Sequence, residues 1–326
     1  MSTTVAVAGS TGFIGQHILR WARSSGVPVL AARSCRVTNG RSTDHRQSVD
    51  RWIADHAPAY RRLLADLNGV DVVINASGVA APTSSSPEAL LCGNVLWPLV
   101  LARAAVEAGT RRLVHVSSAA VQGRRDPLDE SLEQAAFSPY SVSKGRGEHA
   151  LVEAWTTGMG PRELVLYRPT SVHGRGRQAT ASLVRLSRVR YLPVSGSGDQ
   201  PLPITLVENV AAAATLLATT PHPPLVALHP WEGMTTARLM EALAADVPRT
   251  HLPERVVRTA LAATRRLERA SSALTAFSRR LDLLYVGQCV EATALAERGY
   301  VPAVGIEGWR LLGEASTDEG QRGVRR

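Results

Sequence analysis

The sequence predicts a doubly wound α/β fold, in which helices cover both faces of a parallel sheet, with a smaller mixed lobe towards the C-terminus. Short apolar runs of strand length alternate with amphipathic helical stretches. A glycine-rich turn joins the first apolar run to the first helical stretch. The length of 326 residues exceeds one compact unit and suits a domain with an appended lobe.

The first elements form a strand–helix–strand unit. Residues 3–8 predict a buried strand, 14–25 a helix and 27–32 a second strand, which together imply parallel pairing with a right-handed crossover. Residues 34–50 are polar and basic and predict a loop, and 51–67 predict a helix. The alternation continues with strands at 70–75, 113–117, 164–168 and 225–229, and helices at 88–108, 139–157, 207–219 and 235–245.

The composition changes after Pro169, where glycine, proline and arginine become frequent. We therefore expect residues 1–172 to form the sheet domain, with 205–230 returning to it. The substrate-binding lobe is expected from 173–204 and 231–313, and 314–326 as a frayed tail.

Composition excludes several classes of protein. Apolar content is 44%, and no apolar run reaches the roughly 18–20 residues that span a bilayer. The N-terminus lacks a basic segment before its first apolar run, which predicts a cytoplasmic location. Cys35, Cys92 and Cys289 are scattered, and neither they nor the histidines show metal-ligand spacing, so we expect reduced thiols and no metal.

The net charge of +9 favours an anionic partner. Aromatic residues make up only 5% of the chain, which argues against a stacking surface for nucleic acid and favours a phosphorylated small molecule. Residues 254–284 combine an apolar stripe with many arginines. Such a helical region predicts a core-facing or dimer-facing surface, with a membrane surface as the alternative partner and no transmembrane segment.

The glycines of the first turn follow the spacing Gly9-x-x-Gly12-x-x-Gly15. Between a strand and a helix, such glycines let the backbone approach a pyrophosphate, which the free N–H groups of the helix then bind. The turn therefore predicts a dinucleotide site. Its candidate cofactor residues are Gly9, Thr11, Gly12, Phe13, Ile14 and Gly15.

The end of the second predicted strand bears on the choice of dinucleotide. An acidic residue there would bind the ribose hydroxyls of NAD, but the strand ends in Ala32-Arg33, with Arg36 close by. Arginine can pair with a 2′-phosphate. The sequence thus favours NADP, with NAD as the alternative.

One lysine stands among the 37 basic residues, and it is Lys144, four positions after Tyr140. This spacing places both side chains on one face of a helix, where an ammonium can lower the pKa of a phenol. Such a phenol can exchange a proton with a carbonyl oxygen, and the hydroxyl of Ser118 can hydrogen-bond the same oxygen. A compact ammonium suits this position better than a wide guanidinium.

These residues resemble those of extended short-chain dehydrogenases/reductases, of the NAD(P)-dependent sugar epimerase/dehydratase kind. The resemblance implies a Rossmann fold and covers nearly the whole chain in the order of the family. The matching segments are Gly9–Gly15, Asn75–Gly78, Asn94, Val116–Gly123, Pro139–Lys144, Arg168–Gly174, Val207–Ala211 and Gly299–Pro302.

The resemblance implies roles for individual residues. Tyr140 is the catalytic acid/base, Lys144 holds the nicotinamide ribose, Ser118 orients the carbonyl, and Asn94 supports the active-site helix. The remaining implied contacts to the cofactor are Ala76, Ser77, Gly78, Pro169, Ser171 and His173.

The substrate contacts expected besides Ser118 and His173 are Gln122 and Arg175. Arg175 and Arg177 can clamp a diphosphate, although a surface cation is the simpler interpretation of either one alone. Gln122 stands where many relatives have tyrosine. Ala119-Ala120 replace the Asp-Glu pair of the 4,6-dehydratases, which argues against elimination of water.

The sequence favours an NADP(H)-dependent ketoreductase that acts on a nucleotide-activated keto-sugar, as a homodimer. The alternatives are a nucleotide-sugar 4-epimerase with retained NAD and a reductase of a hydrophobic, hydroxysteroid-like ketone. A non-enzymatic nucleotide-binding scaffold is disfavoured, because a scaffold does not need Ser118, Tyr140 and Lys144 together.

Overall fold

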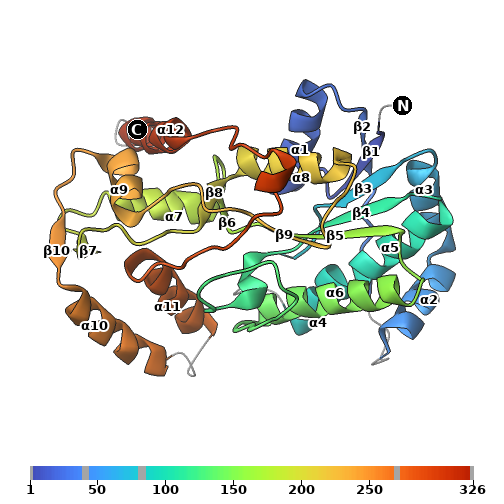
Figure 1. The fold of residues 1–326 in the computed structure, drawn as a ribbon, viewed down its shortest axis with the longest axis horizontal. Coiled ribbons are helices and arrows are strands. Elements are labelled where there is room, and N and C mark those ends of the chain that lie inside the picture. The colour runs from blue at the N-terminus through green and yellow to red at the C-terminus, as the bar shows by residue number, and fades with distance from the viewer. Residues whose placement is uncertain (1–2, 39–43, 80–85, 268–271, 324–326) are drawn as a thin grey trace.

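The computed structural model describes residues 3–38, 44–79, 86–267 and 272–323. Its centre is a six-stranded parallel sheet with the strand order β2-β1-β3-β4-β5-β9 (Figure 1). This arrangement confirms the predicted doubly wound fold. The strands are β1 (Val5–Ala8), β2 (Val29–Ala32), β3 (Val72–Asn75), β4 (Arg112–Val116), β5 (Glu163–Arg168) and β9 (Val226–Leu228).

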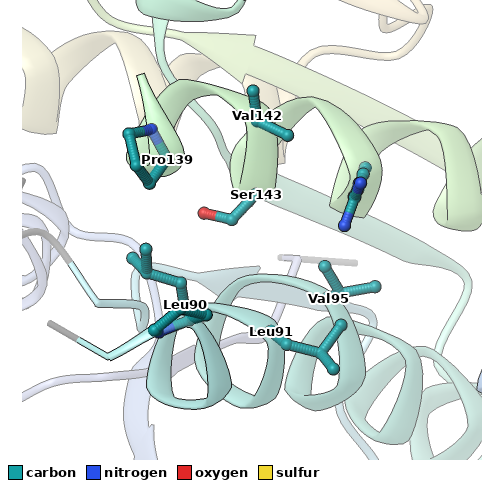
Figure 2. A pocket seen from close by; sticks show the side chains of 8 residues that line it. Leu90, Leu91, Val95, Pro139, Val142 and Ser143 are labelled. Atoms are coloured by element: carbon teal, nitrogen blue, oxygen red, sulfur yellow. The ribbon is translucent and has the colours of Figure 1, made fainter. Parts of the chain in front are cut away.

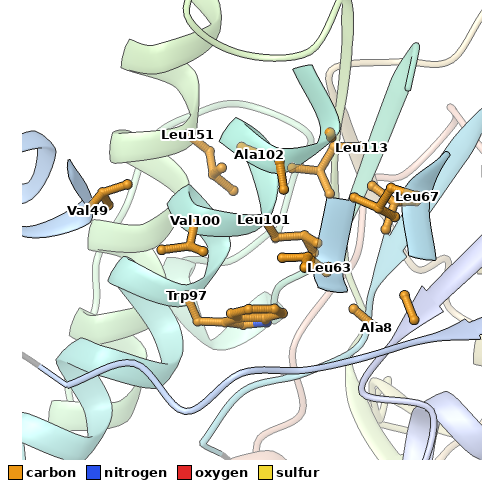
Figure 3. Close-up of a cluster of buried hydrophobic side chains, with 14 of the residues drawn as sticks. Ala8, Val49, Leu63, Leu67, Trp97, Val100, Leu101, Ala102, Leu113 and Leu151 are labelled. Atoms are coloured by element: carbon orange, nitrogen blue, oxygen red, sulfur yellow. The ribbon is translucent and has the colours of Figure 1, made fainter. Parts of the chain in front are cut away.

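Helices cover both faces of the sheet. Helices α1 (Phe13–Ser24) and α8 (Val207–Thr219) pack on one face, and Val5 and Val7 of β1 and Val72 and Ile74 of β3 belong to that layer. The opposite face is covered by α2 (His45–Asp55), α3 (Ala57–Leu67), α5 (Trp97–Glu107) and α6 (Pro139–Thr156) (Figure 1). Figure 3 shows the core on this side, where Trp97, Val100 and Leu101 of α5 lie against Leu63 and Leu67 of α3.

The predicted loop 34–50 is wrong in its second half. Asp44 accepts hydrogen bonds from the backbone N–H groups of Arg46 and Gln47, and this cap starts α2 at His45. The predicted helix 51–67 is therefore two helices, which meet at His56 just before Pro58. Residues 39–43 of the predicted loop lie outside the described part of the chain.

The predicted helix 88–108 is interrupted by a wider turn. Helix α4 (Pro87–Leu91) leads into the π-helical turn η1 (Cys92–Leu96), and α5 follows. Within the described residues, Pro87–Glu107 is the one stretch of helix long and apolar enough to cross a membrane, but 67% of its apolar window is buried in the protein. It is a core helix.

The C-terminal part of the chain adds a further apolar cluster around Trp309, which is 2% exposed. Two short parallel sheets, β6–β8 and β7–β10, accompany it. The strands are β6 (Ser171–His173), β7 (Pro193–Ser195), β8 (Ile204–Leu206) and β10 (Thr250–Leu252), and the helices are α7 (Gln178–Ser187), α9 (Thr236–Ala244), α10 (Glu254–Leu267), α11 (Ser272–Tyr285) and α12 (Ile306–Gly323).

The segment predicted as a frayed tail is helical up to Gly323, and 324–326 lie outside the described residues. Helix α12 is fixed before this point, because Trp309 is buried and Arg188 donates to the carbonyl of Gly313 at 2.6 Å. Gly313 also lies so close to Leu243 that an added Cβ would come within 2.6 Å of its carbonyl oxygen. This anchorage lets the helix continue.

One carboxylate connects three segments of the C-terminal part. Oε1 of Glu232 accepts hydrogen bonds from Thr205 at 2.9 Å and from Asn209 at 2.9 Å. It also lies 2.8 Å from Nε2 of His229, whose Nδ1 meets the hydroxyl of Tyr167 in β5 at 2.6 Å. This buried network joins the sheet to the segments that follow it.

A buried ion pair joins β5 to α6. The Nε and Nη2 atoms of Arg168 donate to the two carboxylate oxygens of Glu148 at 3.0 and 2.7 Å, and both side chains are 0% exposed. Nη1 of Arg168 donates to the carbonyl of Ser131, and the amide of Gln134 donates to Glu148. The pair is thus almost fully satisfied, which is the condition under which buried charges are tolerated.

Replacement of Glu148 by glutamine is expected to lower the free energy of unfolding by about 3–5 kcal/mol, because the Arg168 guanidinium loses its counter-charge in the interior. Urea unfolding followed by circular dichroism measures this loss. The matched control is Glu153→Gln on the same helix, since Glu153 pairs with Arg46 at 3.0 Å while both side chains are more than half exposed. A change of about 0.5 kcal/mol or less is expected there. Equal losses in the two variants would contradict the role given to the buried pair.

Candidate active site

The predicted site residues meet at the carboxyl ends of the parallel strands. The glycine turn follows β1, Ala76–Gly78 follow β3, and Ser118 follows β4 at the start of the short 3₁₀ helix η2 (Ala119–Gln122). Pro169 follows β5, and its carbonyl accepts from the backbone of Ala119, which ties these two loops together. This edge is where ligands bind in open α/β sheets.

The glycine turn lies against the loop after β3. Gly9 has a φ of +82°, and a Cβ added to it would lie 2.6 Å from the backbone nitrogen of Ser77. A Cβ on Gly15 would lie 2.1 Å from the Gly9 carbonyl oxygen, so α1 starts directly on the turn. No side chain caps α1 at Gly12, which leaves the first-turn N–H groups for a ligand. The turn therefore fits the pyrophosphate of a dinucleotide.

Lys144 is buried beside this edge. Its Nζ donates to the carbonyl of Val116 at 3.1 Å, and a Cβ added to Gly78 would lie 3.1 Å from the same Nζ. The Val116 carbonyl and the backbone of Gly78 therefore limit the space around the ammonium on two sides. Burial lowers the pKa of Lys144 to about 8, against the opposing charge of Glu148. The charge on Lys144 is accordingly lost as the pH rises through about 8.

Asn94 holds α6 in place through the π-helical turn. Its side-chain oxygen accepts from the backbone of Val79 at 2.9 Å, and its Nδ2 donates to the hydroxyl of Ser143 at 2.9 Å. Ser143 in turn donates to the carbonyl of Tyr140. A Cβ on Gly147 would lie 2.0 Å from the Asn94 carbonyl, so α6 and η1 approach at backbone distance. Turns of this kind occur often at functional sites.

The hydroxyl of Ser118 and the guanidinium of Arg177 act on the phenol of Tyr140. Burial raises the pKa of Tyr140, while the Ser118 hydroxyl and the charge of Arg177 act against that increase. The sequence predicted that Lys144 would lower this pKa, but the cation that acts on the phenol here is Arg177. The hydroxyls of Tyr140 and Ser118 can both contact a substrate oxygen, and Tyr140 can transfer a proton to it.

A family model described as the NAD dependent epimerase/dehydratase family matches residues 5–226. The match spans the glycine turn, Ser118 and the Tyr140–Lys144 pair. The chain belongs to this family. A search of the curated proteins gives no significant sequence match.

Several solved structures have the same fold. A UDP-glucose 4-epimerase from Thermotoga maritima, with UDP-glucose, has a TM-score of 0.65 and 19% identity, with 97% of this chain and 99% of that chain covered. A double mutant of a dTDP-glucose 4,6-dehydratase from Streptomyces venezuelae, with NAD, gives 0.61 and 18%, covering 94% and 96%. A human epimerase family protein with NADPH gives 0.62 and 20%, covering 96% and 99%.

Within this family fold, Arg177 is partly buried and acts on Tyr140, while Arg175 stays exposed. The Nη1 of Arg177 donates to the carbonyl of Val172 at 2.7 Å, and its guanidinium lies 5.2 Å from the ring centroid of Phe13 in the glycine turn. The sequence favoured a surface position for Arg177 because arginine is so abundant in this chain. The only local signal for a special role is its place after Gly174 and Gly176.

His173 and Gln122 are both engaged by neighbouring side chains. The ring nitrogens of His173 meet Ser171 at 3.1 Å and Thr180 at 3.3 Å, and burial lowers its pKa to about 3. The amide of Gln122 donates to and accepts from Asp129, and its side chain is fully buried. These contacts give both residues structural roles, and their predicted contacts to cofactor and substrate stay predictions.

Arg33 and Arg36 follow β2 and are exposed. The Arg33 side chain is 58% exposed and lies 3.3 Å from Asp66 of α3, a partner that the sequence did not reveal. Ser34 is hydrogen-bonded to Ser77 at 3.1 Å, which links this loop to the loop beside the glycine turn.

A small pocket lies behind the active-site helix, between α4 and the first turns of α6 (Figure 2). Its volume of about 170 Å³ is below the roughly 300–1,000 Å³ of small-molecule sites. Leu90, Leu91, Val95 and Val142 line it, together with Ser143. In the described ranges of the chain, no group of three or more His, Cys, Asp or Glu side chains could hold a metal ion.

Removal of the Arg177 charge by Arg177→Gln is expected to raise the pKa of Tyr140 further, because the cation stabilises the phenolate. NMR of protein with ring-labelled tyrosine follows this titration, and the Tyr140 signal among the six tyrosines is assigned by its loss in Tyr140→Phe. Arg175→Gln removes an equal charge two residues away and serves as the control. An unchanged titration in Arg177→Gln would contradict the assignment.

Proposed function

We propose that this protein is an NADP(H)-dependent ketoreductase that acts on a nucleotide-activated keto-sugar. The observation that carries the proposal is that the Tyr140 phenol, with Ser118 beside it, lies on the edge of the sheet where the glycine turn and Lys144 also lie. A bound nicotinamide cofactor would supply the hydride at this edge.

The side chains of the protein would supply the proton that reduction of the carbonyl requires. Tyr140 donates its phenolic proton to the substrate oxygen as the carbonyl is reduced, and Ser118 donates a hydrogen bond to the same oxygen. Lys144 holds the nicotinamide ribose through its ammonium. Arg177 limits the cost of the negative charge that remains on Tyr140.

The loop after β2 supports NADP over NAD. Arg33 and Arg36 are exposed at the end of this strand, where a 2′-phosphate would lie, and β2 itself ends without an acid. Similar structures contain either nucleotide, since NADPH is bound in the human epimerase family protein and NAD in the dehydratase.

The nucleotide sugar is supported by the basic charge of the chain and by exposed Arg175 beside the site. The similar epimerase from Thermotoga maritima was solved with UDP-glucose. Ala119 and Ala120 stand in η2 directly after Ser118 and offer no carboxyl group for dehydration. These observations favour reduction of a keto-sugar over elimination of water.

A nucleotide-sugar 4-epimerase is the second candidate, because UDP-glucose 4-epimerases are among the similar structures and the same residues would serve both directions of hydride transfer. An epimerase keeps its cofactor through the cycle. Purified protein that releases bound NAD on denaturation, and interconverts two nucleotide sugars without consuming NADPH, would decide for this candidate.

The direct test is NADPH oxidation with a panel of nucleotide-linked keto-sugars. Tyr140→Phe is expected to bind NADPH with unchanged affinity and to lose about 10²–10⁴-fold in kcat, because proton transfer contributes a factor of that size. Fluorescence titration gives the affinity, and absorbance at the NADPH band gives the rate. Activity close to that of the wild type would remove Tyr140 from the mechanism.

Lys144→Arg is expected to lower kcat by at least about a hundredfold although it conserves the charge. The wider guanidinium does not fit here, because the Val116 carbonyl lies 3.1 Å from Nζ and a Cβ added to Gly78 on the other side would already lie 3.1 Å from it. Near-normal turnover, with thermal unfolding also unchanged, would show that the single lysine has no special role.

The homodimer remains part of the proposal. Val142 is 37% exposed beside the pocket of Figure 2, and a charge placed there would oppose a contact through this face. Light scattering of the wild type and of Val142→Glu measures the oligomeric state. A monomeric wild type would exclude the dimer.

A further inference from the structure

The end of β2 carries a carboxylate that comes from another element. Asp66, near the end of α3, accepts a hydrogen bond from the backbone N–H of Arg33 at 3.0 Å. The same oxygen, Oδ2, lies 3.3 Å from the Nε of the Arg33 side chain. The Asp66 side chain is 17% exposed and the Arg33 side chain 58% exposed. The carboxylate is therefore held inside while the guanidinium reaches outwards.

The pairing through Nε leaves the two outer nitrogens of Arg33 without a hydrogen bond to the described residues. Its geometry therefore directs the free edge of the guanidinium away from α3. The other oxygen of Asp66, Oδ1, also makes no hydrogen bond to the described part of the chain. The outer nitrogens of Arg33 and one oxygen of Asp66 are thus not engaged by the described residues, and the oxygen of Asp66 is the more enclosed of the two groups.

The pair lies on the edge that holds the dinucleotide turn. Ser34, next to Arg33, is hydrogen-bonded to Ser77, and the backbone of Ser77 is the group that a Cβ on Gly9 would strike. Arg33 and the glycine turn are therefore connected through two residues. A dinucleotide whose pyrophosphate lies on the turn would direct its adenosine ribose towards the end of β2.

We propose that Asp66 is a specificity-determining residue that restrains the preference for NADP and keeps the site open to NAD. The proposal rests on the proposed function, because it assumes that the glycine turn binds a nicotinamide dinucleotide. Arg33 attracts the 2′-phosphate, while Asp66 partly cancels that attraction by its own charge. With NAD, the free carboxylate oxygen can accept from a ribose hydroxyl, as an acid at the end of β2 would.

The test is the ratio of the NADPH and NADH dissociation constants, measured by fluorescence titration at fixed low salt. Asp66→Asn keeps an oxygen that accepts from the Arg33 N–H and removes the charge. We expect its ratio to shift towards NADPH by roughly three- to tenfold, the effect of one charge at such range in a partly exposed site. Arg33→Gln is expected to shift the ratio towards NADH.

The control is Asp71→Asn. Asp71 also accepts a backbone hydrogen bond, from Thr4 at 2.8 Å, but it precedes β3 and lies at the opposite, amino-terminal edge of the sheet. The ratio is expected to stay within twofold there. A ratio in Asp66→Asn that changes less than twofold, moves towards NADH, or changes as much as in Asp71→Asn overturns the proposal. Arg33→Gln tests the same pair and keeps the proposal testable if Asp66→Asn does not fold. If Arg33→Gln does not shift the ratio of dissociation constants towards NADH, the proposal is overturned.

These outcomes separate the inference from the proposed function. If the wild type binds both dinucleotides and the ratio does not move, Asp66 has no part in specificity and the ketoreductase proposal stands. If the wild type binds neither, the interpretation of the glycine turn is wrong and the inference falls with it.

Discussion

Arg168 and Glu148 place opposite charges in the interior between β5 and α6. The position of the candidate site residues on α6 depends on this contact. Two charges without solvent are tolerated only when their hydrogen-bonding groups are used, so the pair accepts few relative positions of strand and helix. On α6, Lys144 lies four residues and Tyr140 eight residues before Glu148, so both are on the same side of the helix. The ion pair and the Asn94 contacts therefore act together on α6 to fix where the phenol and the ammonium lie.

Lys144 and Arg177, the two cations near the site, have other positions relative to the Tyr140 phenol than the sequence indicates. Spacing on a helix places Lys144 beside Tyr140, but the ammonium turns to the Val116 carbonyl and to the edge where a ribose would bind. Arg177 comes from a distant loop and supplies the charge near the phenol. A local spacing rule cannot reveal this, because the contact depends on how β6 and α7 fold back over Phe13.

Much of the architecture could be predicted because buried parallel strands and their helices leave strong periodic signals. Helix α8 has the predicted bounds 207–219, since its apolar residues continue on nearly every side. The start of α2 depends on the Asp44 cap, a signal that was present but lay in a polar stretch. The side-chain contacts within the site could not be predicted from the sequence, because they depend on the tertiary fold. Asp66 meets Arg33 across 33 positions, and Gln122 is held by Asp129 rather than left for a ligand.

The π-helical turn at Cys92–Leu96 makes the number of residues in this long helix as important as their identity. Each residue of an α-helix turns the chain by about 100°. Deleting one residue from the turn could give α4 and α5 a regular ladder of hydrogen bonds, but it would rotate one of them by that angle relative to the other. Asn94 would then leave Val79 and Ser143, or Trp97 would leave the core. An insertion or deletion in this segment therefore disrupts either the site or the core.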